Sequence, residues 1–427
     1  MPIYIIVIII VAILGLPIVF ALSMGPFIDF IINGQTSMLS TLVQRNYAGI
    51  NKFVLLAVPL FILAGAIMNR GGVTKRLINF SNAFVCHMHG GLAQVNILAS
   101  ILFAGLSGSA IADTSSLGSI LIPAMEDEGY PTDFSAAVTA SSSIIGPIIP
   151  PSIIMIVYAF MMEVSTGALF AAGVLPGIIM GFGLMLMTRR LAIKNHYPRR
   201  EKMSKPEKRK AIKEGILPLF TPIIILGGIL FSICTATEAA VLAVAYALIL
   251  GLFIYKDLKL SDLPKIFMEA GKESAVLLLV IGAAAMFGWV LTITQIPQKL
   301  AIFLLANISS KITFLLLCNL ILFITGMFLD AGPAIMILGP ILSPALLAFN
   351  VNPTHFAIVM CVNLTVGLAT PPFGLVLFAA STVSKLPVGA IIKKMVPYWA
   401  VHVSVILLLT FVPQISLFLP KLVGLPV

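Results

Sequence analysis

Charged residues are scarce in this chain, and that scarcity excludes a soluble globular protein. Asp, Glu, Lys and Arg make up 10% of the 427 residues, hydrophobic residues make up 59%, and the mean hydropathy is +1.11. A soluble domain does not carry so much apolar sequence, so the composition indicates a polytopic protein of the lipid bilayer. The apolar run over residues 3–22 lacks a basic start and a small-residue cleavage site, and we predict that it is a retained helix.

Cysteines are few, and recognisable catalytic motifs are missing. The four cysteines stand alone without a C-x-x-C spacing, which indicates neither disulfides nor a zinc site. The sequence contains no P-loop, no H-E-x-x-H and no recognisable Ser-His-Asp or Cys-His arrangement. It therefore predicts no enzyme activity, no organic cofactor and no ATP-driven transport by this chain.

Positive charge is concentrated in one segment. The formal net charge is +10, and residues 189–213 carry eleven Lys and Arg against Glu201 and Glu207. On a soluble protein such a run suggests nucleic acid, but between membrane spans it is typical of a cytoplasmic loop. We therefore predict no nucleic-acid partner. A cytoplasmic loop here also places the N-terminus in the cytoplasm and the C-terminus on the opposite side of the membrane.

An apolar motif occurs twice in the chain. Residues 117–124 (LGSILIPA) return 221 positions later as residues 338–345 (LGPILSPA), with six of eight residues identical. The same offset carries Gly105 onto Gly326, Gly146 onto Gly367, and the Pro-Pro pair at 150–151 onto 371–372. Matches at Gly and Pro are not explained by shared hydrophobicity. Repeated units with interrupted apolar segments are the sequence signature of a secondary transporter whose site lies between the repeats.

The repeat predicts the organisation of the chain. We expect a first unit over 1–189, a basic loop with a connecting helix over 190–236, and an inverted second unit over 237–427. In each unit one long segment with a polar centre (93–125 and 313–348) is predicted to be a re-entrant hairpin, and one segment broken by Gly and Pro (134–162 and 355–383) a broken helix. Ordinary spans (3–22, 53–69, 165–188, 216–233, 237–255, 274–294 and 396–420) and amphipathic arms (27–48, 73–90, 257–272 and 296–312) complete an all-α polytopic fold with two inverted repeats.

In each unit the hairpin tip and the broken helix are expected to meet near the bilayer midplane. The carbonyls at a half-helix C-terminus suit a hard cation, and the N–H groups at the next N-terminus suit an anion. We therefore predict one cation site in each unit. The candidate ligands are Ser107, Ser109, Gly146, Ile149 and Pro151 in the first unit, and Gly326, Asp330, Gly367 and Thr370 in the second. The alternative is that these residues only allow kinks and close helix packing.

Asp113 and Asp330 are the acids most deeply set in apolar sequence. An ionisable group there is a functional candidate that can ligate a cation, orient substrate or carry a proton. The alternative for both is capping of a hairpin half-helix. Neither hairpin contains Arg or Lys, so an anionic substrate would rely on bound cations, half-helix N-termini and hydroxyl donors. The candidate substrate-binding residues are Ser109, Asp113, Thr114 and Ser143.

These motifs resemble a known family. The segments 107–113, 146–152, 326–333 and 367–372 are similar to the large membrane subunit of tripartite ATP-independent periplasmic (TRAP) transporters. The resemblance covers essentially the whole chain. It implies an elevator-type ion transporter of the bacterial inner membrane, with sodium as the coupling ion and the C-terminus in the periplasm. It also implies two partners, a small four-helix membrane subunit encoded separately and a soluble periplasmic substrate-binding protein.

The resemblance also implies the class of substrate. It implies sodium-coupled uptake of an organic acid, with sialic acid favoured and C4-dicarboxylates next. One alternative remains open from the sequence. A sodium/proton antiporter or an oxyanion exporter of a related fold would also use broken helices, but it would need no binding protein.

Overall fold

The chain folds into helices that differ widely in length. In this computed structural model the structure describes residues 16–427 together with Tyr4, Val7, Ile10, Val11 and Leu14. The described residues contain α-helices, short 3₁₀ and π segments, and no strand. Eight of the described helical segments are long and apolar enough to cross a membrane. The predicted all-α polytopic class is confirmed.

The first half of the chain supplies nine α-helices of the described structure, and a tenth connects it to the second half. The bounds are α2 (Ile18–Ile32), α3 (Met38–Ile50), a 3₁₀ turn (Phe53–Leu56) leading into α4 (Ala57–Arg70), α5 (Val73–Val85), α6 (Gly91–Ser107), α7 (Ala110–Asp127), α8 (Thr132–Ser143), α9 (Ile153–Met162) and α10 (Thr166–Lys194), followed by the connecting helix α11 (Lys205–Leu230).

The second half repeats much of this order. Its bounds are α12 (Ala236–Leu248) with a π segment (Ile249–Ile254), α13 (Leu263–Ile293), α14 (Ile296–Asn307), α15 (Lys311–Phe328), α16 (Ala331–Ala348), α17 (Pro353–Gly367), α18 (Leu375–Ser384), α19 (Val388–Phe411) and α20 (Gln414–Leu422). The pairs α6 and α7, and α15 and α16, occupy the segments predicted as hairpins. The pairs α8 and α9, and α17 and α18, flank the predicted breaks.

Local sequence explains where these helices stop. The turn between α6 and α7 consists of Gly108 and Ser109, and Gly108 takes a φ of +62°, a conformation that costs glycine little. Residues 144–152 between α8 and α9, and 368–374 between α17 and α18, lie outside the α-helices, and both contain a Pro-Pro pair whose peptide bond is cis. Prolines supply no N–H to continue a helix, so each Pro-Pro pair separates two half-helices.

Three predicted boundaries differ from the structure. The predicted span over 3–22 falls mostly outside the described residues, but its end at 22 is wrong because α2 continues to Ile32, and Asn33-Gly34 after it provides a turn. Most of the predicted arm over 257–272 and the span over 274–294 form one helix, α13, because the change from charged to apolar residues contains no proline, and Gly271 alone does not end the helix. The predicted span over 396–420 is divided at Pro413, since Val412 before it leaves the helical region with a φ of −125°.

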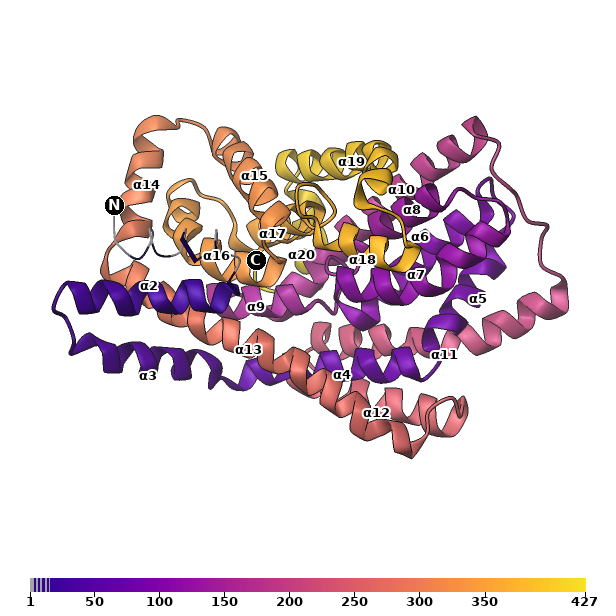
Figure 1. Ribbon diagram of the computed structural model, residues 1–427, viewed down its shortest axis with the longest axis horizontal. Helices are drawn as coiled ribbons and strands as arrows, with labels where there is room; N and C mark the ends of the chain where they lie inside the picture. Colours follow the sequence, from indigo (N-terminus) through magenta and orange to yellow (C-terminus); the bar gives the residue numbers. More distant parts are fainter. Residues whose placement is uncertain (1–3, 5–6, 8–9, 12–13, 15) are drawn as a thin grey trace.

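The helices form two groups in the view of Figure 1. The long helix α13 runs across the lower part of the view and packs along α3 and α4, while α12 packs against α4 and α11 against α12 and α5. The hairpins and broken helices lie above this group (Figure 1). Helix α17 lies among them, and the residues 354–367 along it are buried. The lower group also contacts the group that carries the candidate site, through α5 and α4 against α6 and through α13 against α16.

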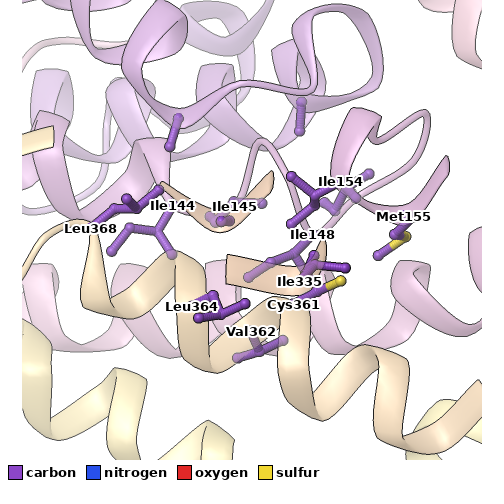
Figure 2. Close-up of a cluster of buried hydrophobic side chains, with 14 of the residues drawn as sticks. Ile144, Ile145, Ile148, Ile154, Met155, Ile335, Cys361, Val362, Leu364 and Leu368 are labelled. Carbon is purple, nitrogen blue, oxygen red and sulfur yellow. The ribbon is translucent and has the colours of Figure 1, made fainter. Parts of the chain in front are cut away.

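The two breaks meet in a shared hydrophobic cluster. Figure 2 shows Ile144 of the first break beside Leu368 of the second break, with Leu364 of α17 and Ile335 of α16 nearby. All of these side chains belong to the buried core. The two halves of the chain therefore pack through their broken segments, and a shift of one break displaces the other because the interior is close-packed.

Candidate functional site

The tip of the first hairpin lies directly against the first break. A Cβ on Gly108 would lie 3.0 Å from the carbonyl oxygen of Pro151 and 3.3 Å from the backbone nitrogen of Ile153. Only glycine allows this approach, because of its positive φ and because any side chain would meet the backbone of the break. The predicted meeting of hairpin and broken helix is present in the first half of the chain.

Asp113 lies at the centre of this contact. It is fully buried in the first turn of α7 and accepts a hydrogen bond from the hydroxyl of Ser107 through Oδ1. Its Oδ2 has no hydrogen-bond partner among the described residues and points at Gly146, where a Cβ would collide with it. Ser107, Asp113 and Gly146 thus come together from three segments. A buried carboxylate oxygen without a partner is costly, and a bound cation is one of the few ways to stabilise it.

Several backbone oxygens of the first break are also without a hydrogen-bond donor in the described structure. Among the described residues no donor hydrogen-bonds to the carbonyl oxygens of Gly146, Ile149 or Pro151. The carbonyl of Pro147, in contrast, accepts a hydrogen bond of 2.6 Å from the hydroxyl of Ser152, which also caps α9. Carbonyl, hydroxyl and carboxylate oxygens are hard ligands that suit alkali or alkaline-earth cations. The residues present fit the cation site that the sequence predicts.

The hydroxyl groups predicted to bind substrate differ in availability. The hydroxyl of Thr114 donates to the carbonyl of Ala110 at 2.8 Å, and the hydroxyl of Ser143 donates to the carbonyl of Thr139 at 2.7 Å. Both protons are therefore used inside the helices. Ser109 caps α7 by accepting from the backbone N–H of Ala112, at 3.4 Å. Its own proton remains available, which makes Ser109 the only one of the three hydroxyls that the described structure leaves as a donor.

The second half reproduces the geometry with a different acid. Asp330 is the N-cap of α16 and accepts a 2.8 Å hydrogen bond from the backbone N–H of Ala331. At the repeat offset of 221 residues, Asp330 corresponds to Ser109, the N-cap of α7, while Asp113 corresponds to Ala334. One oxygen of Asp330 therefore caps a half-helix, as the capping alternative expects, whereas Asp113 is not a cap. The two acids hold non-equivalent positions in the two hairpins.

Gly326 and Gly367 hold the second hairpin against the second break. A Cβ on Gly326 would lie 2.5 Å from the carbonyl oxygen of Leu364, and one on Gly367 would lie 2.6 Å from the Cα of Gly326. Thr370 folds back on the end of α17, where its hydroxyl donates to Val366 and its N–H to the carbonyl of Gly367. Among the described residues, the carbonyls of Gly326 and Thr370 accept no hydrogen bond, so they remain candidate ligands.

A set of buried polar side chains that is not among the residues predicted from the sequence orients these helices. The amide of Asn96 on α6 donates to Thr139 on α8 at 2.7 Å, and Ser100 bonds Ser142 at 2.9 Å. In the second half, Asn363 on α17 donates to Asn319 on α15 at 2.9 Å. The available signal was a polar residue inside each apolar helix, since such groups hydrogen-bond across helix interfaces in membranes. These bonds fix each hairpin on its broken helix.

The comparisons with known proteins decide the family. The family model described as "Tripartite ATP-independent periplasmic transporter, DctM component" matches residues 5–415. The chain belongs to this family of TRAP transporter permeases. This permease is 38% identical over 408 residues to the "Sialic acid TRAP transporter large permease protein SiaM" of Vibrio cholerae, and the alignment covers 96% of this chain and 95% of that protein. It is 41% identical over 372 residues to the "C4-dicarboxylate TRAP transporter large permease protein DctM" of Pseudomonas aeruginosa, covering 87% of each.

A solved structure supports the fold of this permease. The YdaH transporter of Alcanivorax borkumensis, whose crystal structure is described as having an unusual topology, superposes with a TM-score of 0.61 over 90% of this chain and 89% of that one. The sequence identity is 17%, so the similarity concerns the fold alone. Among the described residues of this permease, no three His, Cys, Asp or Glu side chains gather as a metal cluster.

Proposed function

We propose that this permease imports an organic acid together with sodium ions, using the two hairpin tips and breaks as the sodium sites. The observation that carries the proposal is the buried carboxylate oxygen of Asp113, directed at Gly146 of a break whose carbonyls of Gly146, Ile149 and Pro151 receive no donor among the described residues. A sodium ion at this position would neutralise the carboxylate and create the positive potential that an anionic substrate needs. The corresponding second site would use Gly326, Thr370 and the free oxygen of Asp330.

We propose sialic acid as the first candidate substrate and a C4-dicarboxylate as the second. The support is the similarity to SiaM over nearly the whole chain, with DctM of comparable identity. Both kinds of substrate carry carboxylates. The hairpins lack Arg and Lys, so coupling of the acid to sodium follows from the charge balance of the site. Each ligand should raise the affinity of the other by the same factor.

We propose an elevator movement with two partner proteins. Residues 93–188 and 313–395 would form the moving unit, and the remaining helices would form a scaffold that includes α4, α12 and α13. The family description as one component of a tripartite periplasmic transporter supports a small membrane subunit and a periplasmic binding protein as partners. It also argues against the alternative of an antiporter or exporter that works without a binding protein. The basic segment over 189–213 supports a cytoplasmic loop and an N-terminus on that side.

Uptake by proteoliposomes tests the proposal. The permease is reconstituted with its small subunit, and the binding protein loaded with sialic acid or fumarate is added outside. Uptake should require an inward sodium gradient and should stop when choline replaces sodium, because a bulky quaternary ammonium cannot be coordinated by carbonyl and carboxylate oxygens as sodium is. Ser107→Ala and Asp330→Ala should both weaken the dependence on sodium. Equal uptake in sodium and choline would contradict sodium coupling, and uptake without any binding protein would contradict the tripartite arrangement.

A further inference from the structure

A polar cavity lies against α7, next to the corner between α4 and α5. It has a volume of about 350 Å³. One wall is the corner between α4 and α5, with Asn69, Arg70 and Lys75, and the other wall is α7, with Ser116 and Ser119. The volume is in the range of sites that hold small molecules. The cavity therefore lies between a hairpin helix and the scaffold.

The lining of this cavity has the chemistry of an anion site. It contains Arg70 and Lys75 and no Asp or Glu. The side-chain oxygen of Asn69 accepts two hydrogen bonds, from Ser116 at 2.7 Å and from Thr74 at 2.9 Å. Because that oxygen is occupied by two donors, the amide N–H groups of Asn69 remain available to an acceptor. The cavity thus combines two cations with an oriented amide donor.

The two cations are not equally free. The guanidinium of Arg70 lies 3.5 Å from a carboxylate oxygen of Glu269, and both side chains are about half exposed. Lys75 is exposed and forms no ion pair among the described residues. An Arg that is paired with a carboxylate attracts a bound anion less strongly than an unpaired Lys does. Lys75 is therefore the principal source of positive charge in the cavity.

The same helix connects this cavity to the candidate sodium site. Ser116 lies seven residues beyond Ser109, which places it about 10 Å further along α7 at 1.5 Å per residue. Since the hairpin itself contains no Arg or Lys, the fixed positive charge of the cavity comes from the facing wall. That wall lies at the end of α4, next to the basic residues that the charge distribution assigns to the cytoplasm.

We propose that this cavity is an exit subsite, in which Lys75, Arg70 and Asn69 bind the carboxylate of the transported acid after its sodium ions have left. The inference rests on the proposed uptake of an organic acid. An anionic lipid headgroup presents similar chemistry, but a lipid also needs an apolar surface for its acyl chains, and Ile120 is the only large apolar residue in the lining. The small carboxylate is therefore the occupant that this lining favours.

Protection of a cysteine tests the exit subsite. Ser119→Cys is introduced into full-length permease carrying Cys234→Ser, because the other three cysteines are buried. The complex with the small subunit is placed in nanodiscs of neutral phosphatidylcholine, and the rate of maleimide labelling is measured in choline buffer with sialic acid or fumarate. We expect the acid to slow labelling without sodium. Lys75→Gln should weaken the protecting affinity about fivefold, the scale of one partly exposed charged contact.

Matched arms separate the possible outcomes. Lys213→Gln, an exposed lysine on α11 that does not line the cavity, should leave the protection unchanged. The exit subsite would be overturned if neither acid slows the labelling, or if the acid protects the cysteine in Lys75→Gln as well as it does without that substitution. Equal protection by nanodiscs with anionic phospholipid, with no further effect of acid, would assign the cavity to lipid and overturn it as well. Sodium-independent uptake in proteoliposomes would contradict the proposed function instead, so the two failures are distinguishable.

Discussion

Replacing Asp113 by Asn removes the charge at the candidate sodium site while keeping its shape. The amide can still accept the hydrogen bond from Ser107, so the contact between the hairpin turn and α7 is retained. What changes is the oxygen that faces Gly146 and has no partner among the described residues. Because the amide oxygen keeps the hydrogen bond from Ser107, the amide NH2 faces Gly146, where it cannot ligate sodium and its partial positive charge repels the cation.

The size of the effect follows from electrostatics in a buried site. Two unit charges about 4 Å apart interact by about 4 kcal/mol at an effective dielectric constant near 20. Desolvation of the carboxylate offsets part of this attraction, so we expect Asp113→Asn to lose about 1.4 to 2.8 kcal/mol of sodium-binding free energy. This loss raises the sodium concentration for half-maximal uptake about 10- to 100-fold. The fold should tolerate the change, because the variant removes an unpaired buried charge.

The assay is the initial rate of acid uptake against external sodium in proteoliposomes. Asp133→Asn is the matched control, since Asp133 lies in the first turn of α8, at the end away from the break, where it pairs with Lys394 at 3.7 Å. That control should keep the sodium dependence of the unmodified permease. If Asp113→Asn shows the same half-saturating sodium concentration as the unmodified permease at equal folded yield, the carboxylate does not ligate sodium and the reasoning is refuted.

Three further predictions test the packing and movement of the site. Gly367→Ala should lower the free energy of unfolding by about 2 kcal/mol or more, because the added Cβ would meet the backbone of α15. Gly389→Ala is the control and should be tolerated, since an added Cβ there has no atom within 4 Å. Equal melting temperatures of the two variants would contradict the close contact. Asp330→Ala should cost about 1 kcal/mol as a lost N-cap, while Asp330→Asn keeps the cap, and the two melting curves measure the difference. The side chains of Asn69 on α4 and Ser116 on α7 are joined by a hydrogen bond of 2.7 Å. With cysteines at these two positions, a short cleavable thiol crosslinker should stop uptake, and cleavage of the crosslinker should restore it. Undiminished uptake in fully crosslinked permease would count against an elevator.

The sequence predicted the class of the fold and the segments of the site because both depend on local composition. Apolar runs of span length, interrupted by Gly and Pro, report membrane helices and their breaks directly. The repeat at 221 residues located both hairpins and both breaks before any contact was known. Helix continuity was less predictable. Residues 263–293 change from charged to apolar with only Gly271 at the change, so composition suggested two elements where α13 is one helix.

Only the tertiary structure decided what each acid contacts. Asp113 and Asp330 look alike in sequence, but Asp330 is the N-cap of α16 and Asp113 faces Gly146 with one oxygen unpaired. This difference depends on the contact between two segments about 30 residues apart, and sequence periodicity carries no information about such a contact. The cavity beside Lys75 likewise exists only because the corner of α4 and α5 lies against α7. Local chemistry fixes which groups are polar, and long-range packing fixes which of them are left without a partner.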